Sequence, residues 1–268
     1  MMIFYTFLFL ITILSTGTAQ VTNRNFNEEG YRKDWSYRFT PYVLLASQST
    51  NVGGEQIRQS FGDLSSLTNF GFQFVASVRY KRFGLSVDGT IANLGKDLSE
   101  EPILLNFELK QRIIDVNGSY MIYETFEMEE NRVIDGWSIE ALGGVKYWSN
   151  EVGVDFVLVV DNTPILEDIL NQKQKWWDMM VGVRTTISLS QAVLLSSWIN
   201  FGGFGIGNSS KLAYDFTYLN AFRVSRLITI NAGFRNFRYR REDVNNGETL
   251  ETSVNVLGPF LGVSFIFN

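Results

Sequence analysis

The feature that most constrains this chain is an alternation of apolar and polar residues that recurs in run after run. In 175–184, Trp177 and Met179 fall on one face of an extended strand, and Asp178 and Arg184 fall on the other. Many of these runs are about a dozen residues long, whereas strands of soluble proteins have about five to six and membrane-crossing strands about nine to eleven. The pattern therefore favours strands with one face toward lipid and one toward a lumen.

The runs predict an all-β fold, a single antiparallel transmembrane up-and-down β-barrel of about ten strands, with eight or twelve left open. We expect strands at 35–47, 70–80, 83–91, 105–122, 137–147, 175–187, 193–204, 212–223, 228–235 and 257–267. A continuation of the strand at 137–147 through Val152, Val154 and Phe156 is left open. Short helices are expected in the outer loops. One begins at Ser60 with Asp63 reaching back, and another begins at Thr163-Pro164 with Glu167 and Asp168 in its first turn.

A soluble β-sandwich would alternate in the same way, so other features must decide between the two. Rings gather at the ends of runs, as in the aromatic girdles of membrane barrels. The residues concerned are Trp35, Tyr37, Tyr80, Trp137, Tyr147, Trp148, Trp176 and Trp177. Together with strand length, and with the signs of export described next, they favour the barrel.

The N-terminus is typical of an exported protein. Residues 3–14 form an apolar run, and the small residues Gly17 and Ala19 follow at the positions that precede a cleavage site. We expect a signal peptide at 1–19, a periplasmic lead-in at 20–34, and the barrel at 35–268. The start carries no Lys or Arg, which leaves an uncleaved anchor open. The absence of Cys excludes disulfides and thiolate metal sites.

Charged residues at inward positions define the candidate site, and both signs are represented. Either they pair and fill the lumen, or they line a polar path for a small solute. Part of this set requires a β-bulge near 111–113, because the alternation changes phase there. The expected lumen residues are Arg79, Asp88, Glu108, Lys110, Arg112, Glu140, Lys146, Asp178, Arg184, Asp215, Arg223 and Arg235.

The composition argues against catalysis. The chain has no His, which the usual outer-membrane barrel enzymes need as a base or activator, and no converging pair of acids can be identified. We expect no enzyme activity, cofactor or metal. The Gly-rich stretch 202–207 lacks the Lys of a phosphate loop, so we interpret it as allowing strand curvature. The net charge of −5 argues against nucleic acid.

Several short motifs resemble a family of small outer-membrane barrels of Gram-negative bacteria, related to OmpA-like and OmpW-like proteins. They include Trp177-Asp178-x-x-Val181-Gly182-x-Arg184, residues 202–207, 232–235 and 258–263. The ending, with Gly262, Phe265 and Phe267, resembles the C-terminal assembly signal of such barrels. The resemblance implies a fold and a place, the outer membrane. The expected partners are outer-membrane lipid, lipopolysaccharide and, during insertion, the barrel assembly machinery.

Two functions follow from this interpretation. The first is a structural or surface-interaction barrel with a largely closed lumen, whose outer loops at about 48–68 and 149–174 are available to partners. The second is a narrow channel for small or amphipathic solutes. A soluble exported β-protein remains as a third alternative.

Overall fold

The computed structural model describes residues 35–52, 54–97, 103–125, 127–129, 132–160, 163–225, 227–245 and 248–267. The expected signal peptide (1–19) and lead-in (20–34) lie outside these ranges. Within them, no helix is both long and apolar enough to cross a membrane.

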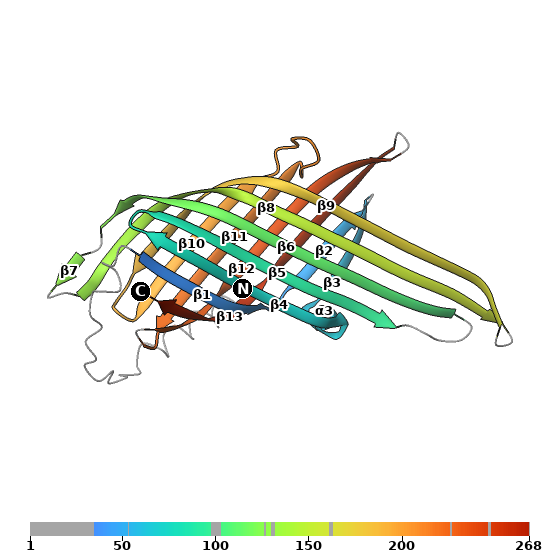
Figure 1. Ribbon diagram of the computed structural model, residues 1–268, viewed down its shortest axis with the longest axis horizontal. Coiled ribbons are helices and arrows are strands. Elements are labelled where there is room, and N and C mark those ends of the chain that lie inside the picture. Colours follow the sequence, from blue (N-terminus) through green and yellow to red (C-terminus); the bar gives the residue numbers. More distant parts are fainter. Residues whose placement is uncertain are drawn as a thin grey trace, which may run out of the picture.

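Ten strands close into a ring in the described part of the chain, which confirms the antiparallel up-and-down barrel (Figure 1). Each strand pairs with the next one along the ring, and β1 pairs with β13 to close it, Tyr37 lying opposite Phe267. A closed ring has no free strand edge, so the sandwich is excluded. The ring strands are β1 (Trp35–Leu44), β4 (Thr68–Tyr80), β5 (Phe83–Asp97), β6 (Ile103–Glu124), β8 (Arg132–Val160), β9 (Thr163–Ser188), β10 (Val193–Gly202), β11 (Leu212–Arg223), β12 (Ile228–Asn245) and β13 (Glu248–Phe267).

The remaining elements lie at the two ends of the ring. At one end, β2 (Ser47–Val52) pairs with β13, β3 (Glu55–Gln59) pairs with β2, and α3 (Phe61–Leu67) follows. Ser60 and Asp63 form the expected capping box, and the Ser60 hydroxyl and backbone N–H hold the pKa of Asp63 below its usual value. At the other end, β7 (Glu127–Glu129) pairs with β8.

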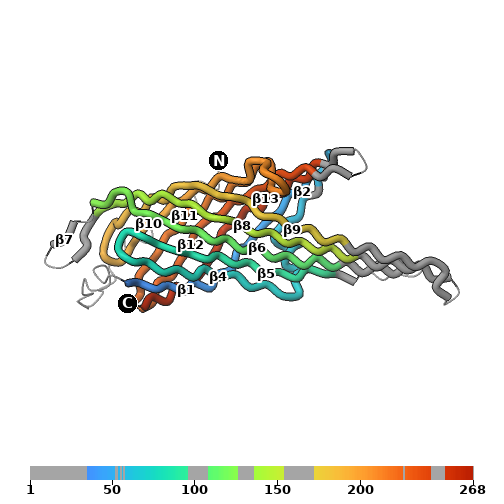
Figure 2. Tube along the Cα trace, turned by 45° about the horizontal axis from the view of Figure 1, so that its top comes forward, coloured from blue at the N-terminus to red at the C-terminus, as the bar shows by residue number. Residues whose placement is uncertain are grey.

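The predicted helix at Thr163-Pro164 and the predicted loop at 149–174 are both wrong. This segment is strand, because β8 and β9 pair from Gly136 opposite Ser188 to Val160 opposite Thr163. The two strands contain 29 and 26 residues, more than a bilayer requires, and their hairpin extends beyond the neighbouring strands (Figure 1). Figure 2 shows the coloured parts of β8 and β9 side by side in the barrel wall. The cross-strand hydrogen bonds along the whole hairpin outweigh the local helix signals of Pro164, Glu167 and Asp168.

The two ends of the barrel differ in their connections. At one end the turns are short: Lys81 and Arg82 join β4 to β5, and 224–227 join β11 to β12. Strand β1 begins and β13 ends at this same end, which we call the short-turn end. The opposite end, with the β8–β9 hairpin and the β2–β3 pair, is called the long-loop end.

The outer wall carries an apolar belt between two sets of rings. Near the short-turn end, Trp35 packs on Tyr80 and Tyr123 packs on Trp137, while Tyr147 packs on Trp177 nearer the long-loop end. From Trp137 to Tyr147, β8 spans about 33 Å along the strand, which at a tilt of about 40° is about 25 Å along the axis. That height matches the apolar band of membrane barrels, about 25 Å.

The pairing of strand β6 shows that three of the expected lumen residues face outward. Its pairing with β5 is continuous from Tyr120 to Asn106, so no bulge occurs at 111–113. Ile113 points inward and is buried. Glu108, Lys110 and Arg112 therefore lie on the outer wall, on the face that carries Ile114 nearer the short-turn end. The change from apolar to charged residues marks the edge of the belt, not a change of face.

An arginine at the middle of the belt should destabilise the barrel. Val181 on β9 is 55% exposed on the outer wall, so Val181→Arg should lower the free energy of unfolding in lipid vesicles by about 2–4 kcal/mol. Leu212→Arg is the matched control, because Leu212 lies opposite Arg240 above the belt and should cost only about 0–1 kcal/mol. Urea unfolding followed by tryptophan fluorescence measures both, and equal losses would contradict the placement of the belt.

Candidate functional site

A layer of ion pairs crosses the lumen near its middle. Lys146 Nζ on β8 lies 3.0 Å from Asp115 Oδ2 and 2.5 Å from Asp215 Oδ2. Arg235 on β12 contacts Asp215 at 2.6 Å and Asp88 on β5 at 2.7 Å. We call these five residues the ion-pair layer. Because they come from β5, β6, β8, β11 and β12, the layer joins strands that are not neighbours in the ring.

Polar neighbours complete the layer. Tyr42 on β1 donates its hydroxyl to Asp88 at 2.9 Å and accepts a hydrogen bond from Arg235 at 2.8 Å. Asn117 donates to Asp115. Lys146 is only 1% exposed and Asp215 is fully buried. Buried charges are tolerated only when they are paired and hydrogen-bonded, and each member of the layer meets this condition.

An aromatic core fills the lumen next to the layer on its long-loop side. Trp148 stacks on Trp176 with ring centroids 5.7 Å apart, and Tyr239 packs against both at 4.8 and 5.2 Å. The space left between the layer and this core is about 10 Å³, at the lower limit for one water molecule. Trp148 and Trp176 were expected in the girdles, but both point inward and are 1% and 2% exposed.

Asp178 supports this core instead of pairing with Arg184. Its carboxylate is fully buried and accepts hydrogen bonds from the indole nitrogens of Trp148 at 2.8 Å and Trp176 at 3.3 Å. It also accepts from the backbone N–H and the hydroxyl of Ser210, at 2.7 and 2.8 Å. Ser210 lies in the Gly-rich connection between β10 and β11, so one carboxylate fastens that connection to the core.

Glycines allow the Gly-rich connection to lie against the barrel. A Cβ at Gly202 would lie 2.1 Å from the carbonyl oxygen of Met179, and a Cβ at Gly203 would lie 2.5 Å from that of Ser210. Gly203 also has φ of +87°, which favours glycine. The close approach predicted for 202–207 is thus present at its first two residues.

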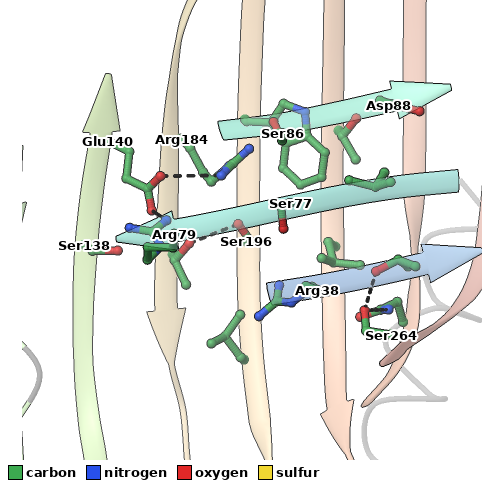
Figure 3. A pocket seen from close by; sticks show the side chains of 18 of the residues that line it. Arg38, Ser77, Arg79, Ser86, Asp88, Ser138, Glu140, Arg184, Ser196 and Ser264 are labelled. Carbon is green, nitrogen blue, oxygen red and sulfur yellow. Dashed lines mark hydrogen bonds and ion pairs between the residues drawn. The ribbon is translucent and has the colours of Figure 1, made fainter. Parts of the chain in front are cut away.

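A cavity of about 520 Å³ occupies the lumen on the short-turn side of the layer (Figure 3). It reaches from Arg235 and Phe260 to the turn residues Lys81 and Arg82. Arg79, Glu140 and Arg184 form a second ionic group on its wall, here called the arginine pair with its glutamate. Glu140 contacts Arg79 at 2.6 Å and Arg184 at 3.4 Å.

The remaining expected residues lie outside both ionic groups. Arg223 ends β11 on the inward side at the short-turn end. Glu108 and Lys110 pair with each other at 3.0 Å on the outer wall. The expected set of lumen residues omitted Asp115 and Tyr42, both of which are buried in the interior. Alternation with the outward Ile114 places Asp115 inward on β6, and alternation places Tyr42 inward on β1, where it carries no charge to mark it. Gly262, Phe265 and Phe267 lie on β13, beside β1.

No protein-family model and no curated protein sequence match the chain. The solved structures similar to it include Gram-negative outer-membrane β-barrels. The outer membrane protease OmpT of Escherichia coli is 10% identical, with a TM-score of 0.49 over 87% of this chain and 97% of that one. Neisserial surface protein A is 14% identical, with a TM-score of 0.33 over 87% and 97%. OprG of Pseudomonas aeruginosa is 13% identical, with a TM-score of 0.27 over 87% and 95%. At these values the likeness assigns no activity and no ligand to this chain.

Removing the lysine of the ion-pair layer should destabilise the barrel strongly. Lys146→Met leaves Asp115 without its cation and Asp215 with only one, both buried, so the free energy of unfolding should fall by about 3–5 kcal/mol. The control is Lys173→Met, which breaks an exposed ion pair with Glu151 and should change stability little. Urea unfolding in lipid vesicles measures both. A loss for Lys146→Met no larger than that of the control would show that the layer does not stabilise the fold.

Proposed function

We propose that this chain is an outer-membrane β-barrel protein with a closed lumen, and that its role is structural or one of surface interaction. The observation that carries the proposal is the filling of the lumen. The ion-pair layer and the aromatic core lie in series, and the free space between them, about 10 Å³, is too small for a continuous file of water. This filling supports a lumen that offers a small solute no continuous path at this level.

The distribution of polarity supports a membrane location. Charges are paired inside the ring, whereas Val181, Leu261 and Ile230 are exposed on its outside. In water this arrangement would expose a continuous apolar wall, and in a bilayer it buries that wall. The short turns would then face the periplasm and the longer connections the cell exterior, as in other barrels of this architecture.

The wall beyond the belt supports a role at the cell surface. Glu108 pairs with Lys110, and Glu151 pairs with Lys173 at 2.6 Å, all on strands that continue past the membrane. These exposed pairs add little stability, so their value lies in presenting a polar surface of both signs. Enzyme activity is not proposed, since the chain has no His, Asp115 and Asp215 are held in ion pairs, and Asp178 is held by four hydrogen bonds.

The alternative of a narrow channel requires the ion-pair layer to open. Arg235 would have to leave Asp215, Asp88 and Tyr42 at once, and the rings of Trp148 and Trp176 would have to separate. Each exposed partner would remain as an uncompensated charge in a narrow lumen. The geometry therefore favours the closed barrel.

The location is tested by fractionation. Expressed from its full gene in a Gram-negative host, the protein should be recovered in the outer-membrane fraction and should migrate faster on a gel when unheated than when boiled. A closed barrel resists detergent and stays compact without heating, which is the reason for the shift. Recovery in the soluble periplasmic fraction with no heat-dependent shift would overturn the proposal.

The closed lumen is tested by electrical recording in planar bilayers. The wild-type protein, once shown to be folded by its heat-dependent shift, should give no reproducible conductance steps. A known porin, purified in the same detergent, controls for insertion. Reproducible steps from the wild type that change in size when Arg184 or Arg235 is replaced by Gln would establish the channel instead.

A further inference from the structure

The cavity on the short-turn side of the lumen has features that the closed barrel does not require. Its volume of about 520 Å³ lies within the range of small-molecule sites, about 300–1,000 Å³. A structural plug would tend to fill this space, as the aromatic core does farther along the axis. The cavity ends at the ion-pair layer, so it is a blind pocket and not part of a path.

The arginine pair with its glutamate carries unused hydrogen-bonding capacity. Among the described residues, Nη1 of Arg79 and Nε of Arg184 are buried and donate to no protein group. One carboxylate, Glu140, is shared between the two guanidinium groups, so this group has one positive charge in excess. Buried donors normally find partners, and two orphan donors on arginines that share one carboxylate indicate a further acceptor.

Part of each arginine side chain remains accessible from the cavity. The Arg79 side chain is 31% exposed and that of Arg184 is 24% exposed, whereas Glu140 is only 4% exposed. Both arginines line the cavity, and Figure 3 shows them on its wall beside Glu140. A molecule in the cavity therefore meets the two cations before it meets the carboxylate.

Arg235 at the far end of the cavity does not compete for such a molecule. Its guanidinium already contacts Asp215 through two nitrogens, at 3.1 and 2.6 Å, together with Asp88 and Tyr42. An anion near it would also approach the Asp88 carboxylate. Of Arg235 and the arginine pair, the arginine pair is therefore the more favourable position for negative charge; Arg38, Lys81 and Arg82 also line the cavity and add positive charge to its wall.

The rest of the wall indicates what the anion is attached to. Hydroxyl groups from strands around the cavity alternate with apolar and aromatic side chains. The apolar members are Val75, Met121, Leu194, Trp198, Leu219 and Phe260. Arg184 lies 5.3 Å above the ring of Trp198, so the cationic and apolar parts of the wall are continuous.

We propose that this cavity binds a small amphipathic oxyanion, a molecule with one carboxylate or phosphate group and a short hydrocarbon chain. The oxyanion accepts hydrogen bonds from Arg79 and Arg184, and the chain packs on Trp198 and the neighbouring apolar residues. Binding itself does not depend on the proposed location, but access from the periplasm rests on the proposed orientation of the barrel.

The test is isothermal titration of the purified, folded barrel in a non-ionic maltoside detergent. The probes are hexanoate, hexyl phosphate, inorganic phosphate, hexanol and hexylammonium. Hexanoate or hexyl phosphate should bind at one saturable site, and inorganic phosphate, hexanol and hexylammonium should bind at least about tenfold more weakly, because each lacks the chain or the negative charge. Equal binding of hexanol, equal binding of inorganic phosphate, or no saturable binding of either amphipathic anion would overturn the proposal.

Variants connect the binding to these residues. Arg79→Gln and Arg184→Gln should each weaken binding of the anionic probe at least about tenfold, since each removes a charge-assisted hydrogen bond. Arg112→Gln is the matched control, because it removes the same charge from the outer wall and should leave binding unchanged. Unchanged binding in both lumen variants would overturn the proposal.

A second variant tests the cavity without altering its charges. Ser77 on β4 lines the cavity, and Ser77→Phe should fill part of it and abolish binding while Arg79, Glu140 and Arg184 are retained. The heat-dependent gel shift confirms that each variant is folded before titration. Full binding by folded Ser77→Phe would place the ligand elsewhere and overturn the assignment. Because titration is done in detergent, its failure would leave the outer-membrane proposal standing, and failed fractionation would leave the binding result standing.

Discussion

The contacts of Lys146 with Asp115 and Asp215 are the interaction on which the interior of this barrel depends. A ring of about eight strands can be filled by side chains alone, but ten strands leave a wider lumen. Only long side chains from opposite walls can meet across it, and their polar ends must then be paired. Lys146 and Arg235 meet this requirement, with Asp215 shared between them.

The same contacts make the strand register specific. A slip of one residue in β11 would turn Asp215 toward lipid and leave both cations without their shared carboxylate. Breaking a buried pair in this way is far more costly than the net stabilisation gained by forming it. The ion-pair layer therefore discriminates between registers more than it adds stability, whereas the backbone hydrogen bonds between strands can form in any register.

In the aromatic core, hydrogen bonds from side chains and backbone stabilise a buried carboxylate. Asp178 is buried, and its carboxylate accepts four hydrogen bonds from Trp148, Trp176 and Ser210. Arg241 lies 4.7 Å from the centre of the Trp176 ring and donates a hydrogen bond to Asn208 at 2.7 Å. The Gly-rich connection is thus held from both sides, and aromatic rings fill the lumen on the long-loop side of the ion-pair layer.

Alternation along the chain, together with the length of the runs, the rings at their ends and the N-terminal apolar segment, predicted a barrel of about ten strands. Alternation alone predicted the inward position of residues such as Asp88, Asp178 and Arg235. It could not locate the edge of the membrane along a strand. Above the belt the outward face becomes charged, so Glu108, Lys110 and Arg112 have the sequence signature of lumen residues while facing outward. For the same reason Trp148 and Trp176 resembled girdle residues, because ring position alone does not distinguish an interface from an interior.

Charge is distributed unevenly along the lumen. The ion-pair layer has an excess of negative charge, and the arginine pair with its glutamate has an excess of positive charge. In the ion-pair layer three carboxylates face two cations, so the layer repels a further anion. In the group near the short-turn end, two guanidinium groups share one carboxylate, so it attracts one. An anion that enters the cavity is drawn to Arg79 and Arg184 and is turned back before it reaches Asp88. In the proposed closed barrel, the ion-pair layer therefore also sets how far a bound anion can penetrate.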